Sequence, residues 1–68
     1  MEVIIMKLFL CSAYAGNYEP TGVVVAETEE EAEEKFKKEL DGEGIWYAGL
    51  IWVQEVKVDG YEIIVRKI

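Results

Sequence analysis

Few residues in this 68-residue chain have the chemistry that catalysis needs. It contains one cysteine, Cys11, and no histidine. A thiol becomes a nucleophile when a neighbouring base or cation favours the thiolate, and histidine is the usual base. Cys11 lies in a β-favouring run, where a free cysteine usually serves as a small buried apolar residue. We therefore expect Cys11 to pack in the core.

Hydroxyl and carboxyl groups offer little more. Ser12, Thr21 and Thr28 lack an activating base, and Thr28 fits a helix N-cap instead. Carboxylates could pair for acid–base chemistry, but most of the glutamates belong to a segment expected to be an exposed helix. An exposed carboxylate is ionised at neutral pH and is a poor acid. We therefore predict that the protein is not an enzyme.

Patterns for metals, nucleotides and nucleic acids are also missing from the sequence. One cysteine and no histidine cannot form a Cys/His zinc site. Asp41-Gly42-Glu43-Gly44 is too short for a calcium-binding loop. The chain has neither a glycine-rich phosphate loop nor a basic patch. We expect no cofactor, no metal, no small-molecule substrate and no direct contact with nucleic acid.

Acidic residues are concentrated in one segment. Nine of the fourteen lie between Glu27 and Glu43, where three lysines leave a charge of −6 out of the net −7. Three pairs place a glutamate four residues before a lysine: Glu31–Lys35, Glu33–Lys37 and Glu34–Lys38. This arrangement stabilises an exposed helix and explains the charge without a partner. In the alternative interpretation the segment mimics nucleic acid and inhibits a nucleic-acid-processing enzyme, with Glu30 and Glu34 as contacts.

Two β-favouring runs precede this segment. Residues 2–14 are largely apolar on both alternating faces, and residues 22–27 form a shorter run of the same type. The turn between them contains Gly16-Asn17 and Pro20. These features predict a hairpin of two strands.

The acidic segment itself predicts one helix, which begins after Thr28 and runs to about Leu40. Thr28 is a favourable N-cap, and Glu31 three residues later completes a capping box. The apolar stripe consists of three residues spaced four apart: Ala32, Phe36 and Leu40. Asp41-Gly42 should end the helix, with the glycine in the C-terminal position. A single stripe predicts packing on one side only.

Residues 45–58 and 61–68 predict a second hairpin. Asp59-Gly60 between them is the strongest short hairpin signal in the chain. A two-residue turn sets these pairs: Val58 with Tyr61, Lys57 with Glu62, Val56 with Ile63, Gln54 with Val65, and Val53 with Arg66. A strand of fourteen residues would be unusually long, so we expect a bulge or bend at Gly49 or at the Ala48-Gly49 pair.

Together the elements predict an α+β fold in a single domain, residues 1–68. The order β-β-α-β-β gives a four-stranded antiparallel sheet with spatial order 2-1-3-4 and one helix packed on one face. We assign the more apolar, even-numbered side of the second hairpin to the helix: Trp46, Leu50, Trp52, Val56 and Val58, with Tyr61, Ile63 and Val65. The opposite face would then expose Ile45, Tyr47, Ile51, Val53, Ile64 and Ile68, which is more apolar surface than a monomer usually leaves in water.

The predicted function rests on the excess of apolar surface and on the small size of the domain. A domain this small has a thin core and needs a further source of stability. We predict a small acidic interaction protein that binds and modulates a larger protein, of the kind that a phage or mobile element encodes. In the alternative, the chain is a self-assembling homo-oligomer, most simply a homodimer, that buries the same face. Tyr18, in the turn beside Pro20, is a further candidate contact.

The N-terminal run is not expected to act as a signal peptide. Glu2 lies where such peptides are positive, and Lys7 interrupts the apolar residues. No stretch approaches the roughly 20 apolar residues that cross a bilayer. One unpaired cysteine fits a reducing compartment. We therefore expect a soluble cytoplasmic protein that does not bind membranes.

Overall fold

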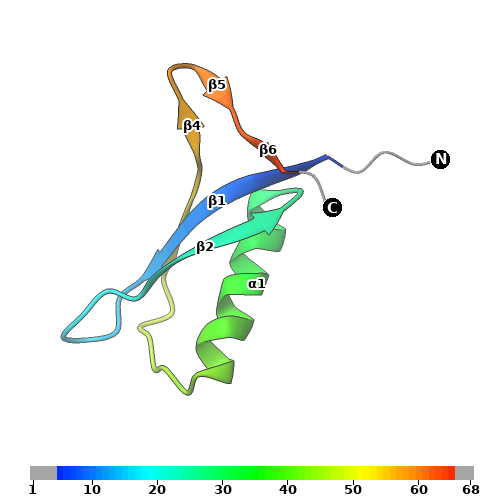
Figure 1. Ribbon diagram of the computed structural model, residues 1–68. Helices are drawn as coiled ribbons and strands as arrows, with labels where there is room; N and C mark the ends of the chain where they lie inside the picture. Colours follow the sequence, from blue (N-terminus) through cyan, green and yellow to red (C-terminus); the bar gives the residue numbers. More distant parts are fainter. Residues whose placement is uncertain (1–4, 66–68) are drawn as a thin grey trace.

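The computed structural model describes residues 5–65, which form one helix and six short strands (Figure 1). The strands are β1 (Met6–Ala13), β2 (Thr21–Ala26), β3 (Ile51–Glu55), β4 (Lys57–Val58), β5 (Tyr61–Glu62) and β6 (Ile64–Val65), and the helix is α1 (Glu29–Gly42). The predicted α+β class, with one helix and an antiparallel sheet, is confirmed. No helix among residues 5–65 has the length and apolar character that a membrane span requires.

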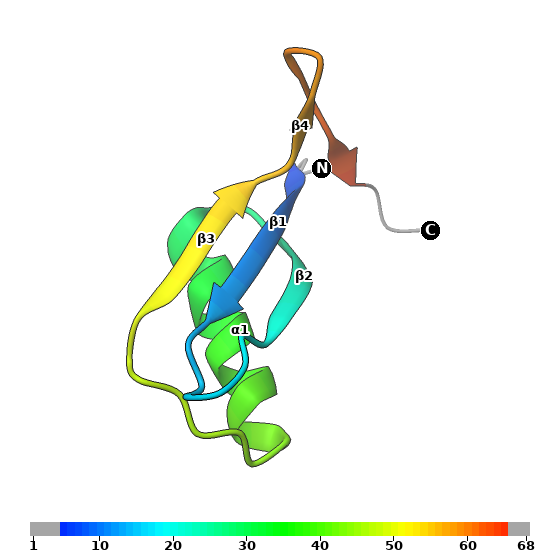
Figure 2. The same ribbon diagram turned by 90° about the vertical axis from the view of Figure 1, so that its left-hand side faces the viewer.

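β1 is the central strand of the main sheet. It pairs antiparallel with β2 on one side and with β3 on the other (Figure 2). The short β6 pairs with Met6 and Lys7 at the start of β1. Because Lys7 already faces Ala26 of β2, β6 must lie on the same side of β1 as β3. β1 therefore holds the sheet together.

The start of α1 is where the sequence predicts it. The Thr28 hydroxyl accepts a hydrogen bond of 3.2 Å from the Glu31 N–H, as an N-cap does. The Glu31 carboxylate contacts the Lys35 ammonium at 3.2 Å rather than the Thr28 N–H. Only the threonine half of the predicted capping box is therefore formed. Glutamates in the first turn add favourable charge at the positive end of the helix dipole.

The helix ends later than predicted and uses a different glycine. It continues through Gly42, and Gly44, with φ of 69°, is the residue in the left-handed region. The Gly44 N–H donates to the Asp41 carbonyl at 3.1 Å, and the Ile45 N–H donates to the Leu40 carbonyl at 2.9 Å. These two bonds form a Schellman motif, which satisfies the last carbonyls of the helix.

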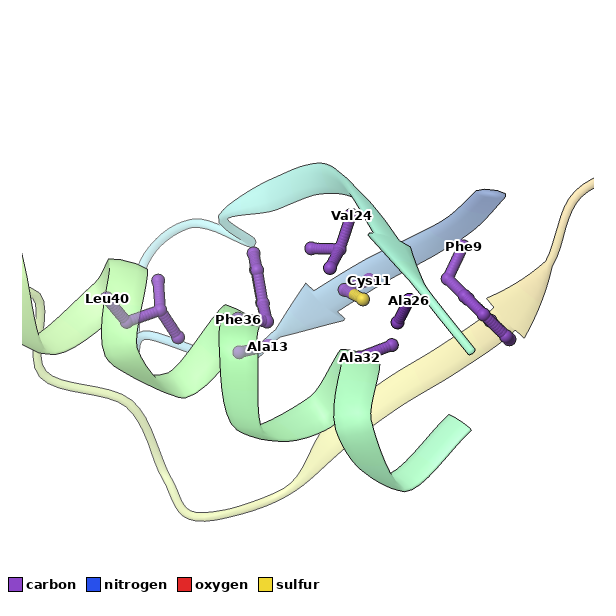
Figure 3. Close-up of a cluster of buried hydrophobic side chains, with 8 residues drawn as sticks. All are labelled: Phe9, Cys11, Ala13, Val24, Ala26, Ala32, Phe36 and Leu40. Carbon is purple, nitrogen blue, oxygen red and sulfur yellow. The ribbon is translucent and has the colours of Figure 1, made fainter. Parts of the chain in front are cut away.

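The core lies between α1 and one face of the sheet (Figure 3). Eight buried residues form it: Phe9, Cys11, Ala13, Val24, Ala26, Ala32, Phe36 and Leu40. The predicted helix stripe is confirmed, since all three of its members are buried. Small side chains such as Cys11, Ala13 and Ala32 allow the helix and the sheet to approach closely.

The prediction of which residues of the second hairpin face the helix is wrong. Four residues assigned to the open face pack against the core instead: Ile45, Tyr47, Ile51 and Val53. Five residues assigned to the helix side are exposed: Trp46, Leu50, Trp52, Val58 and Tyr61. The register explains the error, because Val53 pairs with the buried Cys11 and directly paired residues share a face. Among the described residues of the predicted open face, Ile64 alone is strongly exposed.

The second hairpin has the predicted turn but not the predicted length. Asp59 and Gly60 both have positive φ, at 52° and 82°, and the pairs Val58–Tyr61 and Lys57–Glu62 are confirmed. Beyond these pairs the strands separate. The hairpin rises away from the sheet, and the chain then returns to β1 as β6 (Figure 1). The predicted pairs of Val56 with Ile63 and of Gln54 with Val65 are therefore absent.

Two interruptions of the predicted fourteen-residue strand explain this path. Residues 45–49 are not a strand, and Gly49 has φ of 87°, so the predicted bend is present. At the other end, the Val56 N–H donates to the Leu8 carbonyl at 2.8 Å, and β4 then starts a separate two-stranded sheet. The predictions for Arg66 and Ile68 lie outside the described residues.

Candidate interaction surfaces

Two of the residues considered for catalysis, Cys11 and Thr28, have structural roles. Cys11 is fully buried, as predicted. Burial raises the pKa of its thiol, and the negative charge of Glu39 raises it further. A raised pKa disfavours the thiolate that a nucleophile needs. Thr28 caps α1.

Charged side chains in the described part of the chain do not assemble a metal site, since no three acidic or sulfur ligands converge there. One ion cluster links three strands. The Lys7 ammonium lies 3.7 Å from a Glu55 oxygen and 3.9 Å from a Glu62 oxygen. Because Glu62 is in β5, this cluster ties the protruding hairpin back to the sheet. The second oxygen of Glu55 is buried without a hydrogen-bond partner among residues 5–65.

The sheet face opposite α1, which we call the open face, carries mostly apolar residues. It is formed by Leu8, Leu10, Ser12, Val23, Val25, Trp52 and Gln54, which share one side through the pairs of β1 with β2 and β3. Leu10, Trp52 and Val23 are 42%, 50% and 57% exposed. No side chain of the open face is charged. Such a surface is typical of a contact between proteins.

The molecule exposes more surface than its size requires. Its accessible surface is 5339 Å², whereas a compact monomer of 7.8 kDa would expose about 4,400 Å². The Cα radius of gyration is 13.2 Å, against about 11 Å for a compact domain of this length.

A groove runs between α1 and β3, with a volume of about 290 Å³. Its lining consists of Glu29, Glu30 and Glu33 from the helix and Ile51, Trp52 and Val53 from the strand. Successive side chains of a strand point to opposite faces of the sheet. Ile51, Trp52 and Val53 are consecutive, so they can all line one groove only if the groove runs along the edge of β3. The groove therefore combines an acidic wall with the backbone of an edge strand.

The free edge of β3 can be located from its hydrogen bonds. Val56 directs its N–H towards β1, and alternate residues of an antiparallel strand direct their backbone groups to the same side. Trp52 and Gln54 therefore direct their backbone N–H and C=O groups towards β1. The backbone groups of Ile51, Val53 and Glu55 point outwards, away from β1. Within residues 5–65, no strand pairs with β3 on this side.

The opposite edge of the sheet is partly covered. The Lys35 ammonium donates to the Val25 carbonyl at 2.7 Å, so a helix side chain occupies the outer edge of β2. A helix side chain that covers the edge of a sheet hinders the addition of a further strand. The two edges therefore differ, and the β3 edge is the more available one.

The structure places the predicted contact residues in five different regions. Ile51 and Val53 line the groove together with Glu30, whereas Ile64 lies on β6 and Tyr18 is exposed in the turn between β1 and β2. Ile45 and Tyr47 pack against the core, and Glu34 is exposed but does not line the groove. A binding role for any of these residues stays a prediction.

Sequence reasoning missed the residues of the open face. A usable signal was present in β1, where Cys11 and Ala13 are small and the alternate positions Leu8 and Leu10 are large. A helix that packs closely on a sheet favours small residues beneath it. This asymmetry would have assigned Leu8 and Leu10 to the open face.

No protein-family model matches the chain, and no curated protein or solved structure is significantly similar to it.

Proposed function

We propose that the protein is a small, non-enzymatic interaction protein that binds a larger protein, and that it acts as a homodimer joined through the open face. The observation that supports this most is the position of that face. It is uncharged and apolar, and it lies on the opposite side of the sheet from the acidic helix.

Charge separation favours a second copy as the occupant of the open face. The segment from Glu27 to Glu43 carries most of the net charge, so contact between two helices would be repulsive. Two sheets packed face to face lie about 10 Å apart, with a helix of about 10 Å diameter outside each. The helices would then be separated by roughly 20 Å or more, well beyond the Debye length of about 8 Å at physiological salt.

The small size of the domain also supports this arrangement. A small domain that leaves one sheet face uncovered has a thin core, and a second copy would double the number of packed layers. The dimer would leave both helices and both grooves accessible to a partner protein.

The non-enzymatic part of the proposal is supported by the groups that are present. The chain has no histidine, and its one thiol is buried with a raised pKa. A single unpaired cysteine also supports a cytoplasmic, reducing location.

Two valine variants test the dimer. Val23 on the open face and Val58 on the protruding hairpin are both strand residues and are 57% and 55% exposed. Val23→Lys should raise the dimer dissociation constant by about a hundredfold or more, because burial of an unpaired charge is costly. Val58→Lys, the matched control, should leave the dissociation constant within about twofold, as expected for a surface substitution.

Sedimentation equilibrium would measure these constants, with circular dichroism to verify that each variant is folded. Equal dissociation constants for the two folded variants would contradict the assignment of the open face. A larger effect from Val58→Lys would move the interface to the hairpin.

A further inference from the structure

We infer that the groove between α1 and β3 binds an extended, basic segment of a partner protein, which adds to the sheet as a new strand on the free edge of β3. This inference rests on the proposed function, because it identifies the surface and the chemistry with which the larger protein is bound. Trp52 is the one named residue that the groove lining and the open face share.

The backbone of β3 supplies the first part of the recognition. Ile51, Val53 and Glu55 direct their N–H and C=O groups away from β1, and these groups have no strand partner within residues 5–65. An added peptide strand would satisfy them, as in other cases where an extended segment joins a sheet edge. The outer edge of β2 is less available, since Lys35 already donates to the Val25 carbonyl.

Charge supplies the second part. Three glutamates of α1 line the groove. Glu33 contacts Lys37 at 3.7 Å, whereas Glu29 and Glu30 make no ion pair with any described residue. A basic segment would therefore meet two carboxylates that have no counter-ion within residues 5–65. Clustered negative charge also raises the rate at which a basic partner arrives.

The same charge argues against a second copy in the groove. Pairing β3 with β3 about a two-fold axis would place two sets of groove glutamates beside each other. Like charges across an interface disfavour association. The occupant is therefore a different chain with a positive charge.

The two sides of the groove predict the sequence pattern of the bound segment. Alternate side chains of a strand point to opposite faces. On the helix side they would meet the glutamates, and on the other side they would extend the apolar open face beside Trp52. The segment should alternate basic with apolar residues.

A short synthetic peptide in which lysine alternates with valine is the direct probe. Titration into the 68-residue protein, followed by tryptophan fluorescence and calorimetry, should show saturable binding. A matched peptide keeps the same side chains but carries N-methyl groups at the backbone positions that would pair with β3. It should bind at least about tenfold more weakly, because it loses several hydrogen bonds without losing charge.

Protein variants test the acidic wall. Glu29→Gln combined with Glu30→Gln should weaken binding of the peptide about fivefold, the size expected for two partly exposed ion pairs. Glu43→Gln is the control, since Glu43 caps the other end of α1, about 20 Å away at 1.5 Å per residue. Its effect should be less than about twofold because of screening over that distance.

Several results would overturn the inference. Absence of binding by the peptide would contradict the proposed groove site. Equal binding of the plain and N-methylated peptides would show attraction by charge alone, which would favour the nucleic-acid mimic instead. Equal effects of the groove variant and of Glu43→Gln would place the contact elsewhere.

The two proposals can fail separately. If Val23→Lys loses the dimer but keeps its affinity for the peptide, the open face and the groove act independently, and both proposals are supported. A monomeric wild type that still binds the peptide would overturn the dimer and leave the groove intact. A stable dimer without peptide binding would overturn the groove alone.

Discussion

At the residue scale, Cys11 shows how position determines the chemistry of a side chain. It lies in the central strand beneath α1 with no exposed surface. Burial raises the pKa of the thiol because the charged form loses its hydration, and the negative Glu39 acts in the same direction. Burial of Cys11 therefore disfavours the thiolate, which is the reactive form of this side chain.

This shift predicts a loss of stability at alkaline pH. In the unfolded chain the thiol ionises near its ordinary pKa, while in the folded protein its pKa is higher, so more of the thiol stays protonated at the same pH. The unfolded state then binds fewer protons, so the free energy of unfolding falls as pH rises from the unfolded pKa towards the folded one. Below the unfolded pKa the contribution is constant.

Urea unfolding of the wild type and of Cys11→Ala at neutral and at alkaline pH would measure this effect. The variant should be less stable at neutral pH because it leaves a small cavity. The difference between the two proteins should narrow at alkaline pH, because only the wild type has a thiol to ionise. A difference that stays constant with pH would contradict the assignment.

At the element scale, the two ends of α1 differ in how well the sequence defines them. Thr28 was predictable, because an N-cap depends on a local hydroxyl and a neighbouring N–H. The C-terminal end contains two candidate glycines, and the local sequence favours Gly42. The structure uses Gly44, because Ile45 must return its N–H to the Leu40 carbonyl and its side chain to the core.

The two glycines should therefore respond oppositely to alanine. Gly42 is helical with nothing within 4 Å of an added Cβ, so Gly42→Ala should stabilise the protein by up to about 1 kcal/mol. Gly44 has φ of 69°, so Gly44→Ala should destabilise it by about 1 kcal/mol. Thermal or urea unfolding would measure both changes. The same sign for both would contradict the described helix end.

The second hairpin is only partly predictable from its local sequence. The Asp59-Gly60 turn and its two flanking pairs follow from local backbone preferences and were predictable. The side of the sheet on which Ile51 and Val53 lie was not, because both alternating sides of that strand are apolar. Their side is set by register with β1, where Val53 pairs with Cys11. The return of β6 to β1 likewise depends on a long-range pairing that the sequence does not encode locally.

At the scale of the whole molecule, two surfaces of opposite character lie on different parts of the sheet. The open face is apolar and uncharged, while the groove is bounded by three glutamates and the free edge of β3. The sequence predicted that a second apolar face exists and that the helix is acidic. It could not predict that Glu30 and Val53 would line the same groove, because that depends on how α1 crosses the sheet.

The solution mass of the wild-type protein, measured by light scattering across a dilution series at low and high salt, tests the central claim most directly. The account predicts a mass of twice 7.8 kDa that high salt preserves, because the dimer contact is apolar and the acidic helices are far apart. A monomer at every concentration, or a dimer that dissociates on addition of salt, would contradict a dimer formed through the open face.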